Sequence, residues 1–345
     1  MSRATRTRAI SRAAALGGGG LVGLGSMVFG VLVGEAWLAR RAIGPVTEAP
    51  LDADGRYLPP DGAPGEGSVG QARSSELRLA VLGDSGAAGL GVEQADQTTG
   101  AFMAAGLAAA AGRPVELRCL AVVGAQSVDL ATQVDAALAW SPDVVAVIVG
   151  ANDVTHAVPP GRSVALLTTA VRQLRANDCG VVVGTCPDLG TIRPIPHPLK
   201  LVARQWSRSL AAAQMVGVVE ADGRAVALAD LLGAEVDAHP EVYFGPDRFH
   251  PSVAGYRAVA EVMVPSLLAA LAPDAEPDIG SLEPDRRVHD LAEAAAAAAD
   301  VAGTEVSEAA PARDWRFARL VALRRRPRAS TPDHALREDP SQLQP

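Results

Sequence analysis

The stretch Leu-Arg-Leu-Ala-Val-Leu-Gly-Asp-Ser, residues 77–85, decides the fold of this chain. Its apolar run extends from Leu77 to Leu82 with one interruption at Arg78, and Gly83 then ends it. A short apolar run that stops at a glycine is typical of a strand buried on both faces. Such strands belong to parallel sheets that are covered by helices on both sides.

Four further apolar runs follow, and stretches with helical character separate them. The expected strands after Leu77–Leu82 are 115–123, 144–149, 181–184 and 216–219. The expected helices are 98–111, 128–139, 162–176, 199–214 and a last one at 252–271. This alternation predicts an α/β fold, a three-layer α/β/α sandwich around a mostly parallel five-stranded sheet.

The composition outside this pattern predicts flanking segments around one domain at 77–272. Residues 42–76 are rich in Pro, Gly, Asp and Ser, which is typical of a flexible linker. Residues 273–345 form a low-complexity tail, in which 313–328 mixes arginines with apolar residues. That segment is either a basic amphipathic helix that contacts an anionic surface or a solvated charge run, and both interpretations stay open.

The N-terminal residues 1–41 have the pattern of a single membrane anchor. Four arginines precede a charge-free run from Ala13 to Gly34, and Arg40 and Arg41 follow it. The run is long enough to span a bilayer as a helix. The arginine excess at its start predicts a cytoplasmic N-terminus, with the domain at 77–272 outside. The alternative is a cleaved signal peptide, which would make the protein secreted.

Charge and cysteine content exclude several other classes of protein. The net charge of -8 argues against nucleic-acid binding. Three cysteines are too few for a disulfide scaffold, and no Cys/His cluster predicts a metal site. Cys179 and Cys186 flank the fourth expected strand and would pair only if their side chains face each other, so a disulfide stays open.

Polar residues that can do chemistry follow the expected strands. Gly83-Asp84-Ser85 follows the first, Gly124 to Ser127 the second and Gly150-Ala151-Asn152-Asp153 the third. Asp247-Arg248-Phe249-His250 precedes the last helix. Because sites in parallel sheets form at the carboxyl ends of the strands, we expect these residues to share one edge.

These residue types suit nucleophilic catalysis. A serine hydroxyl such as Ser85 attacks a carbonyl only when a base takes its proton, and His250 suits that role. Asp247 lies three residues before it, so that one turn holds both side chains together and the carboxylate orients the imidazole. Backbone N–H groups at Ser85 and Gly124 and the Asn152 amide are the expected oxyanion donors.

These four blocks, in this order, resemble those of the SGNH (GDSL-like) serine ester hydrolase superfamily over roughly residues 77–272. The resemblance implies a flavodoxin-like sheet, no cofactor and hydrolysis of acyl esters. The resemblance also implies the roles of the site residues. Ser85 would be the nucleophile, Asp247 and His250 its triad partners, and Gly124 and Asn152 the oxyanion donors. Gly86 stands where the older motif name has leucine, a difference expected to bear on the acyl pocket rather than on catalysis.

The sequence therefore predicts a serine esterase or lipase that acts on an acyl ester of a lipid, glycan or small molecule. An acyltransferase with the same triad and a non-catalytic surface-binding module are the alternatives. We expect Asp84 to cap the turn before Ser85 and Asp153 to be structural. His156 is a candidate substrate contact, and Cys119 is expected in the core.

Overall fold

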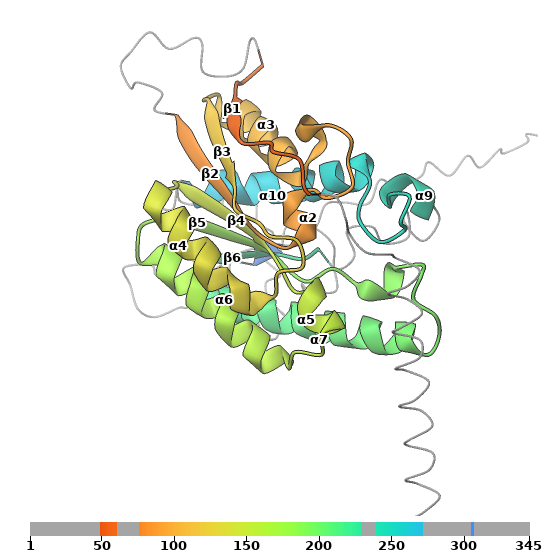
Figure 1. Ribbon diagram of the computed structural model, residues 1–345. Coiled ribbons are helices and arrows are strands. Elements are labelled where there is room, and N and C mark those ends of the chain that lie inside the picture. Colours follow the sequence, from red (N-terminus) through yellow and green to blue (C-terminus); the bar gives the residue numbers. More distant parts are fainter. Residues whose placement is uncertain (1–48, 61–75, 229–238, 272–304, 307–345) are drawn as a thin grey trace, which may run out of the picture.

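A seven-stranded sheet runs through the part of the chain that the computed structural model describes, residues 49–60, 76–228, 239–271 and 305–306 (Figure 1). The strand order is β1-β3-β2-β4-β5-β6-β7. The five central strands are parallel to their neighbours, whereas β1 and β7 pair antiparallel at the two edges. The strands are β1 Gly55–Tyr57, β2 Leu77–Gly83, β3 Val115–Cys119, β4 Val144–Ile148, β5 Gly180–Gly184, β6 Arg224–Val226 and β7 Glu305–Val306.

Helices cover both faces of this sheet and complete the predicted three-layer sandwich (Figure 1). Helices α3 (Thr99–Ala111) and α10 (Val253–Ala270) pack on one face. Helices α4 (Leu130–Trp140), α6 (Pro160–Arg175) and α7 (Leu199–Glu220) pack on the other. Three short helices, α2 (Ser85–Ala88), α5 (Ala151–Thr155) and α9 (Pro240–Tyr243), lie in the connections.

The central position of β2 explains why its sequence is almost continuously apolar. Leu79 and Val81 point into the core beneath α3 and α10, whereas Ala80 and Leu82 point into the core beneath the other three helices. Successive side chains of a strand alternate between faces, so a central strand must be apolar at nearly every position. Arg78 is the one exposed residue of β2.

The fifth strand lies later in the chain than the sequence indicates, so the prediction of a strand at 216–219 is wrong. Those residues belong to the end of α7, and the strand is β6, Arg224–Val226. Met215, Val218 and Val219 continue the buried face of the helix. Packing of this face outweighs the strand preference of a short valine-rich run.

The expected linker 42–76 also contains a strand. Residues 55–57 form β1 and pair with β3, and the side chain of Ala53 is buried. The Asp54 carboxylate accepts a hydrogen bond from the backbone N–H of Cys119 at 2.6 Å. Residues 55–57 therefore belong to the sheet, and Ala53 and Asp54 contact it, so this part of the expected linker is ordered against the domain. At the other edge, β7 comes from the expected tail 273–345.

The predicted membrane anchor at 1–41 and the basic segment 313–328 lie outside the described residues. Among the described helices, α10 alone is long and apolar enough to span a membrane. However, Tyr256, Met263 and Leu267 of this helix are fully buried in the domain.

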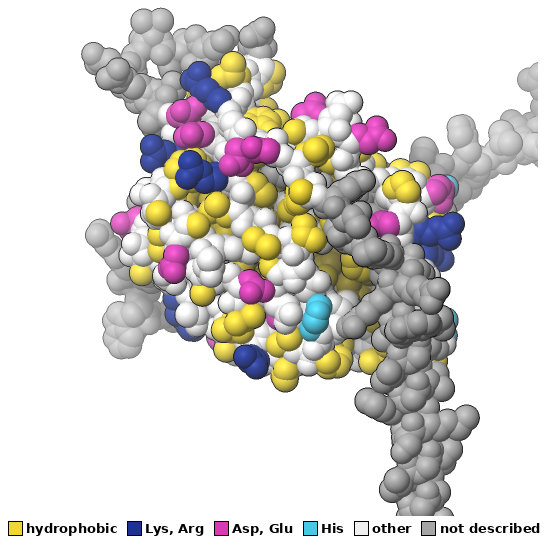
Figure 2. Space-filling model, viewed as in Figure 1, with side chains coloured by type: hydrophobic (Ala, Val, Ile, Leu, Met, Phe, Trp, Pro, Cys, Tyr) yellow, Lys and Arg dark blue, Asp and Glu magenta, His cyan; other side chains and the backbone are white. Residues whose placement is uncertain are grey.

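The described surface drawn in Figure 2 carries charges of both signs. Lys and Arg side chains lie next to Asp and Glu side chains around its margin, and hydrophobic side chains are spread across its centre. This face of the described residues differs from the continuous basic surface that binds nucleic acid.

Candidate active site

The turn after β2 brings Ser85 to the carboxyl edge of the sheet. Gly83 ends the strand with φ +134°, a conformation that L side chains rarely adopt. The next N–H, that of Asp84, donates to the carbonyl oxygen of Ile148 at the end of β4 (3.1 Å). The chain then turns away from the sheet, and Ser85 begins α2.

Asp84 caps this turn, as predicted. Its buried carboxylate accepts a hydrogen bond from the backbone N–H of Gly86 at 2.9 Å. Burial raises the pKa of Asp84 from its ordinary value of 3.8 to about 6, and this hydrogen bond only partly opposes the effect. The carboxylate thus holds the first turn of α2, where Ser85 stands.

Ser85, His250 and Asp247 form one hydrogen-bonded row. The Nε2 atom of His250 lies 3.1 Å from Ser85 Oγ, and its Nδ1 atom lies 2.6 Å from Asp247 Oδ2. The other oxygen of Asp247 accepts the backbone N–H groups of Phe249 (2.9 Å) and His250 (3.0 Å). Arg248 makes the turn between them with φ +58°. The spacing of three residues places Asp247 beside His250, as the sequence indicates.

The hydrogen bonds around Asp247 stabilise its ionised form. Burial raises its pKa, but the hydrogen bonds from the His250 side chain and the Phe249 N–H outweigh burial and hold the pKa below the ordinary value. An ionised carboxylate favours the proton on Nδ1 of His250 and leaves the Nε2 lone pair for Ser85. The Phe249 ring packs edge-on against the His250 ring, with centroids 4.8 Å apart, and helps to fix its orientation.

Gly124 and Asn152 lie in the connections that follow β3 and β4, the strands on either side of β2. Strand β3 stops at Cys119, earlier than the predicted 115–123, and an exposed loop carries Gly124 with φ +81°. The Asn152 side chain, on α5 after β4, donates through Nδ2 to the carbonyl oxygen of Ala125 at 3.1 Å. A carboxamide has two N–H groups, so Asn152 keeps a second donor beside the Gly124 loop.

Asp153 fastens this loop to the rest of the domain. Its fully buried carboxylate accepts from the backbone N–H (3.1 Å) and hydroxyl (3.2 Å) of Ser127, whose Oγ lies 2.8 Å from that of Ser163. Burial raises the pKa of Asp153 above its ordinary value. These contacts give Asp153 a structural role, as the sequence predicts.

Comparison with known proteins shows the family to which the chain belongs. Residues 81–258 match the model of the GDSL-like Lipase/Acylhydrolase family. The chain belongs to this family. A GDSL-like esterase of Mycobacterium tuberculosis, Rv1075c, is 36% identical over 299 residues, which cover 83% of this chain and 93% of the relative. The protein is thus an esterase of the GDSL family, as predicted.

Solved structures of similar proteins have lower identity. TesA is 22% identical, with a TM-score of 0.43, and the match covers 56% of this chain and 99% of TesA. Axe2, an acetylxylan esterase from Geobacillus stearothermophilus, is 20% identical, with a TM-score of 0.44 and coverage of 56% and 95%.

Two buried glutamines near the site of this GDSL esterase were not predicted from the sequence. Gln133 of α4 hydrogen-bonds both backbone polar groups of Gly83. Gln214 of α7 accepts from the N–H of Cys186 (2.7 Å) and donates to the carbonyl of Val149 (3.1 Å). A glutamine within a helix has the pattern of a surface residue, so no sequence signal marks either one.

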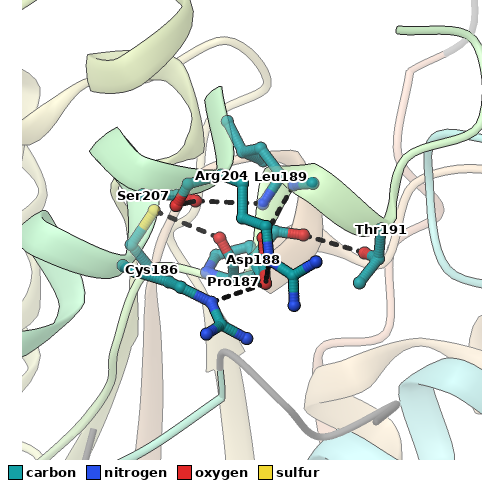
Figure 3. A network of polar contacts seen from close by, with 9 residues as sticks. Cys186, Pro187, Asp188, Leu189, Thr191, Arg204 and Ser207 are labelled. Atoms are coloured by element: carbon teal, nitrogen blue, oxygen red, sulfur yellow. Dashed lines mark hydrogen bonds and ion pairs between the residues drawn. The ribbon is translucent and has the colours of Figure 1, made fainter. Parts of the chain in front are cut away.

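A buried aspartate holds the loop after β5 in the esterase (Figure 3). The Asp188 side chain is 1% exposed and lies 2.9 Å from Arg208 Nε and 3.4 Å from Arg204 Nε. Its other oxygen accepts the backbone N–H of Gly190 at 2.7 Å. Helix α7 also supplies Ser207, whose Oγ accepts the N–H of Leu189. This polar network fixes the loop at the carboxyl edge of the sheet.

The remaining expectations concern single side chains. All three cysteines are free, so Cys179 and Cys186 do not pair, and Cys119 is half-buried in β3. His156 is exposed and its Nδ1 lies 2.8 Å from the carbonyl oxygen of Asn152. Among the described residues, no three His, Cys, Asp or Glu side chains are grouped so that they could hold a metal ion.

Proposed function

We propose that the protein hydrolyses carboxylic esters through Ser85, with His250 as the base and Asp247 as the carboxylate that orients it. The observation that carries this proposal is the row of contacts at 3.1 Å and 2.6 Å. Ser85 Oγ attacks the acyl carbonyl while its proton passes to His250 Nε2. Asp247 stabilises the imidazolium that forms.

The oxyanion of the tetrahedral intermediate forms beside the Gly124 loop. We assign its donors to the backbone N–H groups of Ser85 and Gly124 and to the second N–H of the Asn152 amide. Gly124 supports this role because its exposed backbone has no side chain to keep the substrate away.

His250 then returns its proton to the leaving alcohol, and the acyl group remains on Ser85. A water molecule, deprotonated by His250, attacks this acyl-enzyme and releases the carboxylic acid. An alcohol that replaced the water would make the same site an acyltransferase, so product analysis with added alcohol separates the two activities.

The test is hydrolysis of p-nitrophenyl acetate, butyrate and octanoate by the full chain and by Ser85→Ala. We expect the variant to lose about 10³-fold or more in kcat/KM. Ser209→Ala, which alters an exposed serine of α7, serves as the control and keeps full activity. Equal hydrolysis by Ser85→Ala and the parent would exclude the proposal.

The base also predicts a pH profile. Activity should rise between about pH 5 and pH 8, because a histidine base accepts the proton only when its imidazole is neutral. A flat profile between about pH 5 and pH 8 would contradict this assignment.

We also propose that residues 1–41 anchor the esterase in the cell membrane with its catalytic domain outside, and that 313–328 contacts anionic lipid. The charge-free run and its flanking arginines support the anchor. Protease added to intact cells should degrade the domain, and deletion of 1–41 should release it from membranes. Deletion of 313–328 should weaken binding to anionic vesicles but not to neutral ones.

A further inference from the structure

We propose that Gln133 is a positioning residue of the reaction, which fixes the nucleophile turn relative to the loop that carries Gly124. The inference rests on the proposed role of Ser85 as the nucleophile.

The Gln133 side chain holds the last residue of β2 from both of its polar groups. Gln133 is 4% exposed on α4. Its Oε1 accepts the backbone N–H of Gly83 at 2.7 Å, and its Nε2 donates to the Gly83 carbonyl at 3.0 Å. Gly83 stands two residues before Ser85, so the carboxamide fixes the backbone from which the nucleophile turn departs.

This contact fills a gap that the sheet leaves open. Strand β3 pairs with β2 only up to the register Val81↔Cys119. Beyond that point the chain of β3 leaves as a loop, so Gly83 pairs with Ile148 of β4 on one side but has no residue of β3 opposite it on the other. A carboxamide carries one acceptor and donors in a plane, as a peptide group does, so Gln133 replaces the missing strand residue. Without the Gln133 side chain, the buried N–H of Gly83 would have no acceptor.

Gly83 also contacts both the turn that carries Ser85 and the loop that carries Gly124. Its carbonyl oxygen accepts a second hydrogen bond, from the backbone N–H of Val122 at 3.0 Å. Val122 precedes Gly124 by two residues in the Gly124 loop. Gln133 thus holds a group that contacts both the Ser85 turn and the Gly124 loop, and it sets the distance between nucleophile and donor.

The expected consequence is a loss in kcat rather than a rise in KM. The oxyanion donors bind charge that develops in the transition state, so a displaced donor costs little in ground-state binding. Catalysis is sensitive to such displacement, since a misplacement of about 1 Å can cost on the order of 100-fold.

The experiment compares Gln133→Met and Gln133→Glu in the full chain, with p-nitrophenyl butyrate as substrate. Methionine has a similar length but makes neither hydrogen bond, and we expect kcat to fall roughly 10- to 100-fold with little change in KM. A buried glutamic acid in its neutral form offers one donor and one acceptor. Gln133→Glu should therefore work at low pH and lose kcat on ionisation, at pH values where the parent still gains activity.

Val134→Ala is the matched control for a general loss of stability. Val134 is the next residue of α4 and is fully buried in the core, so its truncation leaves a cavity without touching Gly83. Its kcat should stay near that of the parent. A loss equal to that of Gln133→Met would overturn the proposal, as would an unchanged kcat in Gln133→Met.

Labelling by a fluorophosphonate separates failure of this inference from failure of the proposed function. If the parent and Ser85→Ala are labelled alike, the nucleophile assignment itself is wrong, and the inference falls with it. If Ser85-dependent labelling stands and Gln133→Met is labelled as fast as the parent, only the positioning role is excluded. Should Gln133→Met not fold, the pH profile of Gln133→Glu decides: a profile like that of the parent overturns the proposal.

Discussion

A β-carbon placed on Gly83 would lie 1.8 Å from the carbonyl oxygen of Ile148. That oxygen accepts the N–H of Asp84 at 3.1 Å, so the backbone of β4 lies against Gly83 at the point where Ser85 leaves the sheet. The glycine of the Gly-Asp-Ser block therefore has a steric function that is separate from the chemistry of the serine.

Gly83→Ala should strongly destabilise the protein. The new methyl group meets backbone that cannot move aside, and φ of +134° adds strain. We expect the free energy of unfolding, measured with urea, to fall by more than about 3 kcal/mol. Gly161→Ala is the control, because a β-carbon there meets nothing within 4 Å in helix α6 and should be neutral or stabilising. Similar midpoints for the two variants would refute the steric argument.

Asn152→Ala should slow the chemical step. Loss of one oxyanion donor lowers kcat by about 10²- to 10³-fold, with little change in KM. Initial rates with p-nitrophenyl butyrate measure both constants. Asn177→Ala, at an exposed asparagine after α6, should retain the kcat of the parent. An unchanged kcat in Asn152→Ala would remove Asn152 from the oxyanion site.

Asp84 should make stability depend on pH. Its folded pKa of about 6 lies above the ordinary 3.8, so folding favours the protonated acid. The stabilisation is complete below about pH 4 and is lost as pH rises through 6. Asp84→Asn keeps an acceptor for Gly86 and removes the charge, and it should raise the free energy of unfolding at pH 8 by up to about 3 kcal/mol. Equal gains at pH 4 and pH 8 in denaturation curves would contradict this linkage.

Asp188 and its two arginines should contribute unequally to stability. Asp188→Ala leaves the N–H of Gly190 unpaired and removes the buried carboxylate that Arg208 contacts, and should cost about 3 kcal/mol. Arg204→Gln should cost at most about 1 kcal/mol, since the Arg204 side chain is 50% exposed. Thermal unfolding of both variants gives the comparison. Equal losses of stability in Asp188→Ala and Arg204→Gln would contradict this prediction.

The sequence was sufficient to predict four of the five central strands and the meeting of Ser85, His250 and Asp247, because these features leave local signals. Strand β2 is apolar at nearly every position since it is buried on both faces, and its alternation with helices is regular. Ser85, Asn152 and the Asp247–His250 pair each stand next to the end of an element. Once the sheet is parallel, its topology alone brings them to one edge.

The features that the sequence did not predict depend on tertiary contacts. A run such as 216–219 has strand-like composition, yet its burial pattern continues helix α7. Strand β1 stands among residues typical of a linker, and only its pairing with β3 makes it a strand. Gln133 looks like any polar residue of a helix until Gly83 is seen beside it.

The contact between Ser85 and His250 joins residues that are 165 positions apart in the chain. The hydroxyl of Tyr256, in helix α10, donates to the carbonyl of Leu90 and joins the same two regions inside the core. Under the proposed mechanism, a nascent chain on the ribosome thus contains its nucleophile long before its base is synthesised. We therefore expect fragments that end before helix α10 to lack esterase activity.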